Sequence, residues 1–193
     1  MRFKIEQKLK ENLMPFLSGI GDEMVVADIF NWSPEAGRCI SEWHQIVMRG
    51  DSPLSVAERE LVGAYTSGVN SCDLCYGVHK LVAEKFGIEE GVFEALSDDI
   101  DTAPVDEKMK PLLRFARKLT LEPAKMLRAD AQAVFDAGWS EQALHDAINV
   151  ICMSNFMIRI VLGLGGTEGD ISPHFEAAAD FLTNTGYVAD GAP

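Results

Sequence analysis

Apolar residues recur at helical intervals over most of the chain, and the alternating pattern of strands is nearly absent. Ser55 and Glu58 have the spacing of a capping box, which predicts that a helix begins there. Its apolar positions continue to about residue 70. A second apolar stripe follows over about 71–86 and stops at Gly87. We expect these two segments to form an antiparallel helical hairpin.

Six further segments are predicted to be helical from their apolar spacing and from Pro, Ser and Gly at their ends. They cover residues 34–48, 89–96, 106–121, 130–137, 140–162 and 173–184. No stretch has the composition of an interdomain linker. The sequence therefore predicts a single all-α domain of about eight helices over residues 1–193, built around the hairpin at 55–87.

Composition and charge narrow the classes of partner. The 193 residues are 47% hydrophobic and 24% charged, which is typical of a globular protein, and the net charge is -13. Such a chain repels nucleic acid and anionic lipid. The N-terminus lacks the apolar core of a signal peptide, and the apolar run at 147–158 is shorter than the roughly 20 residues that span a bilayer. We expect a cytoplasmic protein with no nucleic-acid or membrane partner.

Candidate chemistry gathers on the hairpin. Cys72, Cys75 and His79 are spaced three and four residues apart, so they project from one face of the second helix. With the turn near Asn70, Glu60 lies roughly 15 Å back along the first helix and His79 roughly 14 Å along the second. The two residues thus lie at the same depth. Provided that their helix faces also agree, Glu60 can contact His79.

This arrangement favours thiol chemistry. Both cysteines fall in the first turn of a helix, whose positive end stabilises a thiolate. The imidazole of His79 can accept the thiol proton, and the carboxylate of Glu60 can orient that imidazole. A second thiol one turn away can form a disulfide after the first is oxidised to a sulfenic acid. Asp73, beside the pair, works against ionisation.

The pattern Glu60, eleven residues, Cys72-x-x-Cys75, three residues, His79 resembles the redox centre of the alkyl hydroperoxidase D (AhpD-like) family, within the carboxymuconolactone decarboxylase superfamily. The stretch 58–79, with 103–108 and 138–139, resembles the branch called peroxidase-related enzymes, and the match covers roughly 50–165. This resemblance implies an all-α AhpD-like fold, a homo-oligomer and a peroxide-reducing dithiol.

The resemblance also implies individual roles. Cys75 would attack the hydroperoxide, Cys72 would resolve the product as a disulfide, and Glu60 and His79 would relay the proton. A thioredoxin-like protein or a dihydrolipoyl carrier would be the reductant. The best-known members have a second histidine between the cysteines, where this chain has Leu74. We expect no metal or organic cofactor.

Other interpretations of the motif stay open. The cysteines could be a buried pair without redox function, or could join His79 as zinc ligands, although the sequence offers no clear fourth ligand. Haem attachment would need a histidine where Tyr76 stands. At the level of function the alternatives are a lactone decarboxylase and a non-enzymatic redox-sensing or interaction protein whose cysteine pair alters oligomer packing.

Residues outside the motif receive structural interpretations. Cys39 and Cys152 stand singly in apolar helices and are predicted to be core residues. His44 and His145 are predicted to be interface or capping groups.

The long apolar helix at 140–162 contains two further pairs. Met153 and Met157 are predicted to be core residues. Asn155 and Arg159, four residues apart, indicate a buried polar contact or a subunit interface.

Overall fold

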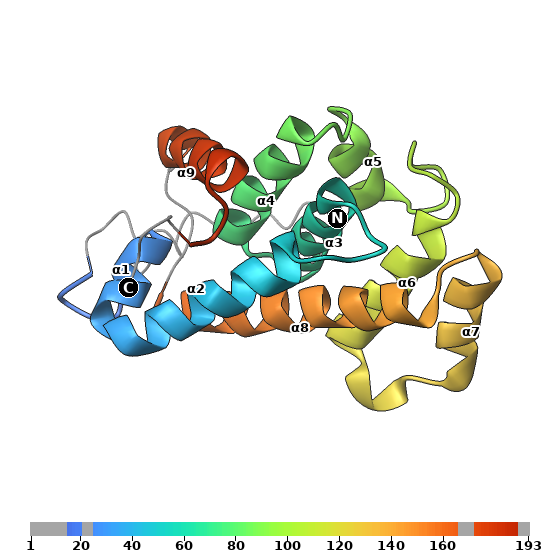
Figure 1. Ribbon diagram of the computed structural model, residues 1–193, viewed down its shortest axis with the longest axis horizontal. Helices are drawn as coiled ribbons and strands as arrows, with labels where there is room; N and C mark the ends of the chain where they lie inside the picture. Colours follow the sequence, from blue (N-terminus) through green and yellow to red (C-terminus); the bar gives the residue numbers. More distant parts are fainter. Residues whose placement is uncertain (1–14, 21–24, 166–171, 189–193) are drawn as a thin grey trace.

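The computed structural model describes residues 15–20, 25–165 and 172–188, and within these ranges the regular structure is all helical (Figure 1). The elements are α1 Val26–Trp32, α2 Pro34–Arg49, α3 Val56–Val69, α4 Asp73–Lys85, α5 Val92–Asp98, α6 Met109–Leu121, the 3-10 turn η2 Pro123–Lys125, α7 Arg128–Asp136, α8 Glu141–Gly163 and α9 Ser172–Asn184. The all-α prediction is confirmed. Each of the eight expected helices is present with bounds that differ by a few residues, and α1 is additional, since its seven residues are too few to establish a period.

Local capping explains where the two central helices begin. The backbone N–H of Glu58 donates to Ser55 Oγ at 3.2 Å, and the backbone N–H of Ser55 donates to Glu58 Oε2 at 2.8 Å. This is the predicted capping box. At the start of α8, Ser140 Oγ accepts from the backbone N–H of Ala143 at 3.1 Å.

The hairpin of α3 and α4 is the centre of the molecule. Helix α3 packs against α4, α6 and α8, and its residues from Arg59 to Ser67 are all buried. Between the helices the chain reverses at Ser71, whose φ of 57° is left-handed. In Figure 1, α8 runs along the base of the molecule, and α9 lies beside α4 although about 90 residues separate them.

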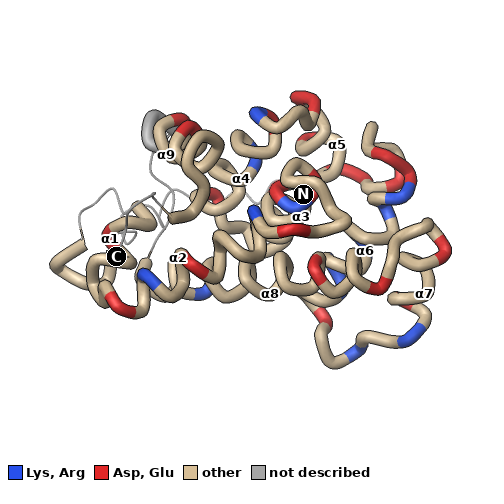
Figure 2. Tube along the Cα trace, viewed as in Figure 1, with Lys and Arg blue, Asp and Glu red and all other residues tan. Residues whose placement is uncertain are grey.

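Helix α8 supplies much of the core. At 23 residues it is long and apolar enough to cross a membrane by length and composition, yet ten of its side chains are buried against the rest of the protein, as in the core helix of a globular domain. Met153 and Met157 are among the buried residues, which confirms their prediction. Figure 2 shows the acidic positions spread over most helices and their connections.

The prediction for the two single cysteines is wrong, because Cys39 and Cys152 are both exposed. On α2 the buried positions are Gly37, His44 and Met48, and Cys39 lies roughly 200° around the helix axis from Gly37. An apolar helix that packs on one side only leaves its other side in solvent, and the cysteine lies there.

Three polar residues of α8 differ in what they contact. Arg159 Nη1 donates to Asn155 Oδ1 at 2.8 Å, and Asn155 Nδ2 donates to Thr120 Oγ1 at 3.1 Å, so a polar contact ties α8 to α6. It is not the buried contact that the sequence predicted, because Arg159 is exposed. His145 is exposed beside Asp146, with 3.1 Å between Nδ1 and Oδ1.

Candidate dithiol site

The two cysteines of the motif lie at the N-terminus of α4. Cys72 is the N-cap residue and is 1% exposed, whereas Cys75 is half-buried in the first turn. Both thiols are free, and their Sγ atoms are 3.0 Å apart, so they make a hydrogen bond and not a disulfide. The separation means that a disulfide between them requires only a small movement of the side chains.

The two thiols have opposite tendencies to ionise. The hydrogen bond from the Cys75 side chain lowers the pKa of Cys72 against the effect of burial, and the backbone N–H of Cys75 lowers it further. The same side-chain hydrogen bond, together with burial, raises the pKa of Cys75 well above its usual value. When the reduced pair loses one proton, the negative charge is therefore favoured on Cys72 and the remaining proton on Cys75.

Glu60 and His79 are in contact across the hairpin. His79 Nδ1 lies 2.7 Å from Glu60 Oε2, and Glu60 is fully buried. The equal depth of these residues on antiparallel helices thus corresponds to a real contact, because their faces agree. Burial raises the pKa of Glu60, but the hydrogen bonds and positive charges of His79 and Arg49 outweigh burial and lower that pKa overall. Glu60 is therefore ionised, so Nδ1 of His79 is the donor and Nε2 is the nitrogen left for proton transfer.

The second oxygen of Glu60 has two partners that sequence reasoning missed. Arg49 Nη1 donates to Glu60 Oε1 at 2.6 Å, and the Tyr187 hydroxyl donates to the same oxygen at 3.2 Å. Arg49 also lies over the rings of Tyr187 and Phe86, at 5.0 and 5.3 Å from their centroids. A basic residue ending α2 is ordinary on dipole grounds, and Tyr187 follows the last helix, so neither carried a signal.

Two solved structures resemble this one over most of their length. An uncharacterized peroxidase-related protein from Silicibacter sp. TM1040 superimposes with a TM-score of 0.69 over 76% of this chain and 78% of its own, at 24% identity. The alkylhydroperoxidase AhpD core of an uncharacterized peroxidase-related protein from Ralstonia eutropha JMP134 superimposes with a TM-score of 0.69 over 84% and 80%, at 21% identity. The chain has the AhpD-like fold. No protein-family model and no curated protein matches the sequence.

Within this AhpD-like fold, Cys75 and His79 open onto a cavity of about 430 Å³, which we call the dithiol cavity. Its wall is mainly apolar and comes from α1, α2, α4, α8 and α9. Representative apolar lining residues are Val26, Phe30, Val78, Met157, Phe175 and Leu182. Cys72 does not line it, so Cys75 is the thiol that a molecule in the cavity reaches.

His44 also lines the dithiol cavity, and it is neither a cap nor an exposed interface group in this structure. Its Nδ1 lies 2.7 Å from the carbonyl oxygen of Ile40, and its ring leans on Tyr187 with 5.3 Å between centroids. Burial lowers the pKa of His44 to about 4, against the opposing effect of the Ile40 hydrogen bond. The imidazole is therefore neutral near pH 7.

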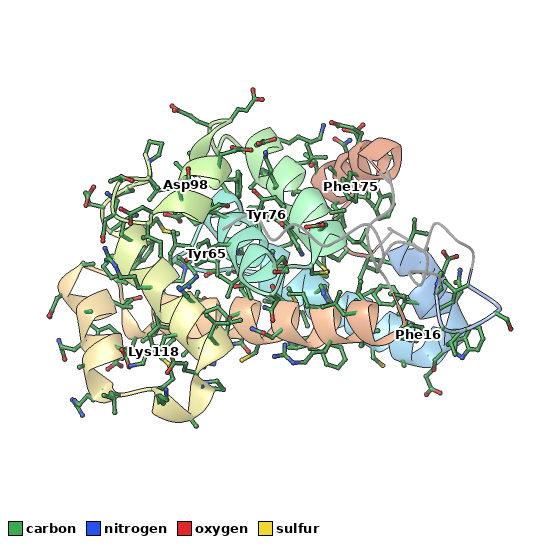
Figure 3. All side chains as sticks on the ribbon, turned by 180° about the vertical axis from the view of Figure 1, so that it is seen from behind. Phe16, Tyr65, Tyr76, Asp98, Lys118 and Phe175 are labelled. Carbon is green, nitrogen blue, oxygen red and sulfur yellow. The ribbon has the colours of Figure 1, made fainter. Side chains whose placement is uncertain are left out.

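A second cavity, of about 600 Å³, lies between the hairpin and helices α5 and α6, and we call it the charged cavity. Figure 3 shows Tyr65, Tyr76 and Asp98, three of its lining residues, near one another on the face seen from behind. Arg114, which also lines it, forms an ion pair with Asp101. Among the residues lining this cavity there is no cysteine or histidine.

The described residues contain no group of three or more His, Cys, Asp or Glu side chains arranged to hold a metal ion. Cys72, Cys75 and His79 thus do not converge as three ligands.

Proposed function

We propose that this protein is a thiol-dependent hydroperoxide reductase that acts on organic hydroperoxides. The observation that carries the proposal is the position of Cys75, whose thiol is 3.0 Å from a second thiol and opens, with His79, onto an apolar cavity. Structural neighbours that are named peroxidase-related support this reaction class.

In the first step, the Cys75 proton leaves for His79 Nε2, and the Cys75 thiolate attacks the terminal, hydrogen-bearing oxygen of the hydroperoxide. An S–O bond forms and the O–O bond breaks. The alkoxide that departs takes the proton from His79 and leaves as an alcohol. Cys75 is oxidised to a sulfenic acid, and Glu60 holds the imidazole in the orientation that this transfer needs.

In the second step, the Cys72 thiolate attacks the Cys75 sulfur. The S–S bond forms, the S–O bond breaks, and hydroxide leaves as water after it gains a proton. The balance is one hydroperoxide and two thiols giving one alcohol, one water and one disulfide. The lowered pKa of Cys72 supports this role, because it raises the fraction of the resolving thiol that is ionised.

An external dithiol completes the cycle, and we propose a thioredoxin-like protein or a dihydrolipoyl carrier. Its thiolate would attack the Cys75 sulfur, which is the more accessible of the two, and Cys72 would depart. A thiol of low pKa is the better leaving group, so the same electrostatics that favour resolution favour reduction from this side.

The test is consumption of cumene hydroperoxide and of hydrogen peroxide by the protein with dithiothreitol as reductant. We expect turnover with a preference for cumene hydroperoxide, since the cavity is apolar. Cys75→Ser and Cys72→Ser should each abolish turnover, and His79→Ala should reduce it markedly. Unchanged activity in Cys75→Ser would sink the proposal. An inactive parent that still forms the Cys72–Cys75 disulfide would point instead to redox sensing.

A further inference from the structure

His44 has one nitrogen engaged and one free. A carbonyl oxygen only accepts hydrogen bonds, so the 2.7 Å contact with Ile40 requires that Nδ1 carry the hydrogen. In a neutral imidazole this leaves Nε2 as an acceptor. Among the described residues, Nε2 has no hydrogen-bond partner. The ring cannot swing away easily, since Tyr187 and Trp43 pack on it at centroid distances of 5.3 and 6.1 Å.

A hydroperoxide entering the dithiol cavity brings one O–H donor into mainly apolar surroundings. Leaving that donor without an acceptor would weaken binding, because a buried unsatisfied donor loses its hydrogen bond to water. His79 also lines the cavity, but its free nitrogen is the one that moves the proton. His44 approaches from a different helix, α2, and is 6% exposed.

We propose that His44 is the group that orients the substrate, with Nε2 accepting the hydrogen bond of the –OOH group so that the terminal oxygen faces Cys75 Sγ. This inference rests on the proposed hydroperoxide reductase function and adds a substrate-contacting residue to it. The two imidazoles then have separate duties: His79 transfers the proton, and His44 holds the oxygen that the thiolate attacks. No proton is lost or gained at His44 during the cycle.

The test compares variants that keep or remove an acceptor at this place. His44→Asn keeps a donor for the Ile40 carbonyl, and His44→Phe keeps the ring packing, but neither has an acceptor at the position of Nε2. His44→Gln places its amide near the position of Nε2 and restores an acceptor. Glu42→Gln is the matched control, because Glu42 is another polar α2 residue that is exposed and does not line the cavity.

Two rates are measured on each reduced protein in a single turnover: oxidation by cumene hydroperoxide, and alkylation of Cys75 by iodoacetamide. We expect His44→Asn and His44→Phe to slow the first rate about tenfold, with the second within about twofold of the parent. His44→Gln should recover to within about threefold, and Glu42→Gln should match the parent. Having two variants without the acceptor keeps the test valid if one of them does not fold.

Each other result overturns the inference in a recognisable way. If the parent reacts and both variants without the acceptor react equally fast, His44 has no such contact, and the proposed function stands. If alkylation slows as much as oxidation, or if His44→Gln is as slow as His44→Phe, the residue acts only through the fold or the thiol. If the parent is alkylated but does not react with hydroperoxide, the proposed function itself fails and takes this inference with it.

Discussion

The α3–α4 hairpin contributes to two cavities that share no lining residue, and they differ in size and chemistry. The charged cavity is the larger, at about 600 Å³, and exposes arginine and aspartate side chains. The dithiol cavity holds about 430 Å³ and is mainly apolar, but Cys75 and two histidines open onto it. Volume alone would favour the charged cavity. Our proposed reaction is placed in the dithiol cavity because a thiol and two imidazoles meet there.

The geometry of α4 explains the division. Cys75, Val78 and His79 line the dithiol cavity, whereas Tyr76, about 100° around the helix axis from Cys75, lines the charged cavity. The charges differ in the same way. Beside the dithiol cavity they are buried and paired, and around the charged cavity they are solvated. We expect substitutions around the two cavities to differ in their effects on stability and activity.

The largest difference in stability should lie between the Arg49–Glu60 ion pair and the Arg114–Asp101 ion pair. Glu60 is fully buried against Arg49, so Glu60→Gln leaves a poorly solvated guanidinium without its counter-charge and should lower the free energy of unfolding by about 3 kcal/mol. Asp101→Asn breaks the ion pair with Arg114. The Asp101 side chain is 68% exposed and that of Arg114 is 47% exposed, so this change should lower the free energy of unfolding by no more than about 1 kcal/mol. Urea unfolding of both variants measures this. Equal losses would show that the two sides are energetically alike.

Low pH should destabilise the folded protein through His44, which lines the dithiol cavity. Its pKa is about 4 in the folded protein and 6.5 in its ordinary state, so between these values the unfolded chain binds a proton that the folded chain does not. Stability is therefore lost as the pH falls from 6.5 to 4, by about 3 kcal/mol in total. Urea titrations across this window should show the slope in the parent and a much weaker one in His44→Phe. Glu60, whose pKa is lowered, adds its own loss only below pH 4.5.

A large side chain in the dithiol cavity should lower the rate of hydroperoxide reduction, whereas one in the charged cavity should not. Val78 on α4 lines the dithiol cavity, and Val69 on α3 lines the charged cavity. Val78→Trp should lower the rate with cumene hydroperoxide about tenfold, because the indole occupies space beside Cys75; this corresponds to about 1.4 kcal/mol in the barrier. Val69→Trp should leave the rate within about twofold of the parent. A large loss in Val69→Trp would assign the charged cavity a part in the reaction.

The smallest effect concerns two helical glycines. A Cβ added at Gly77 would lie 2.5 Å from the ring of Phe175, so α9 packs directly on the α4 backbone there. Gly77→Ala should destabilise the protein by about 1 kcal/mol, since overpacking outweighs the gain in helix propensity. At Gly68 the nearest atom is 3.4 Å away, on Tyr76. Gly68→Ala should instead stabilise by about 0.5 kcal/mol. Thermal unfolding distinguishes the two variants. Stabilisation in both would mean that α9 moves away from α4 at little cost.

Much of the site follows from local rules. The cap at Ser55 and the stop after the second helix define the hairpin, and the equal depth of Glu60 and His79 from the turn places them together. These inferences succeed because they depend on helical rise and period, which are the same in any context. Cys39 and Cys152 were predicted to be buried but are exposed. The helical period identifies a face of a helix, but it does not show whether another element covers that face.

What the amino-acid sequence determined by itself is the helical architecture and the spacing of Cys72, Cys75, His79 and Glu60, since both arise from contacts within one hairpin. Only the tertiary structure decided the rest. Arg49 and Tyr187 reach Glu60 from α2 and from beyond α9, and neither has a spacing that relates it to the motif. The apolar cavity is shared among five helices, so no single segment encodes it. Long-range packing, and not local periodicity, formed the apolar cavity onto which Cys75 and His79 open.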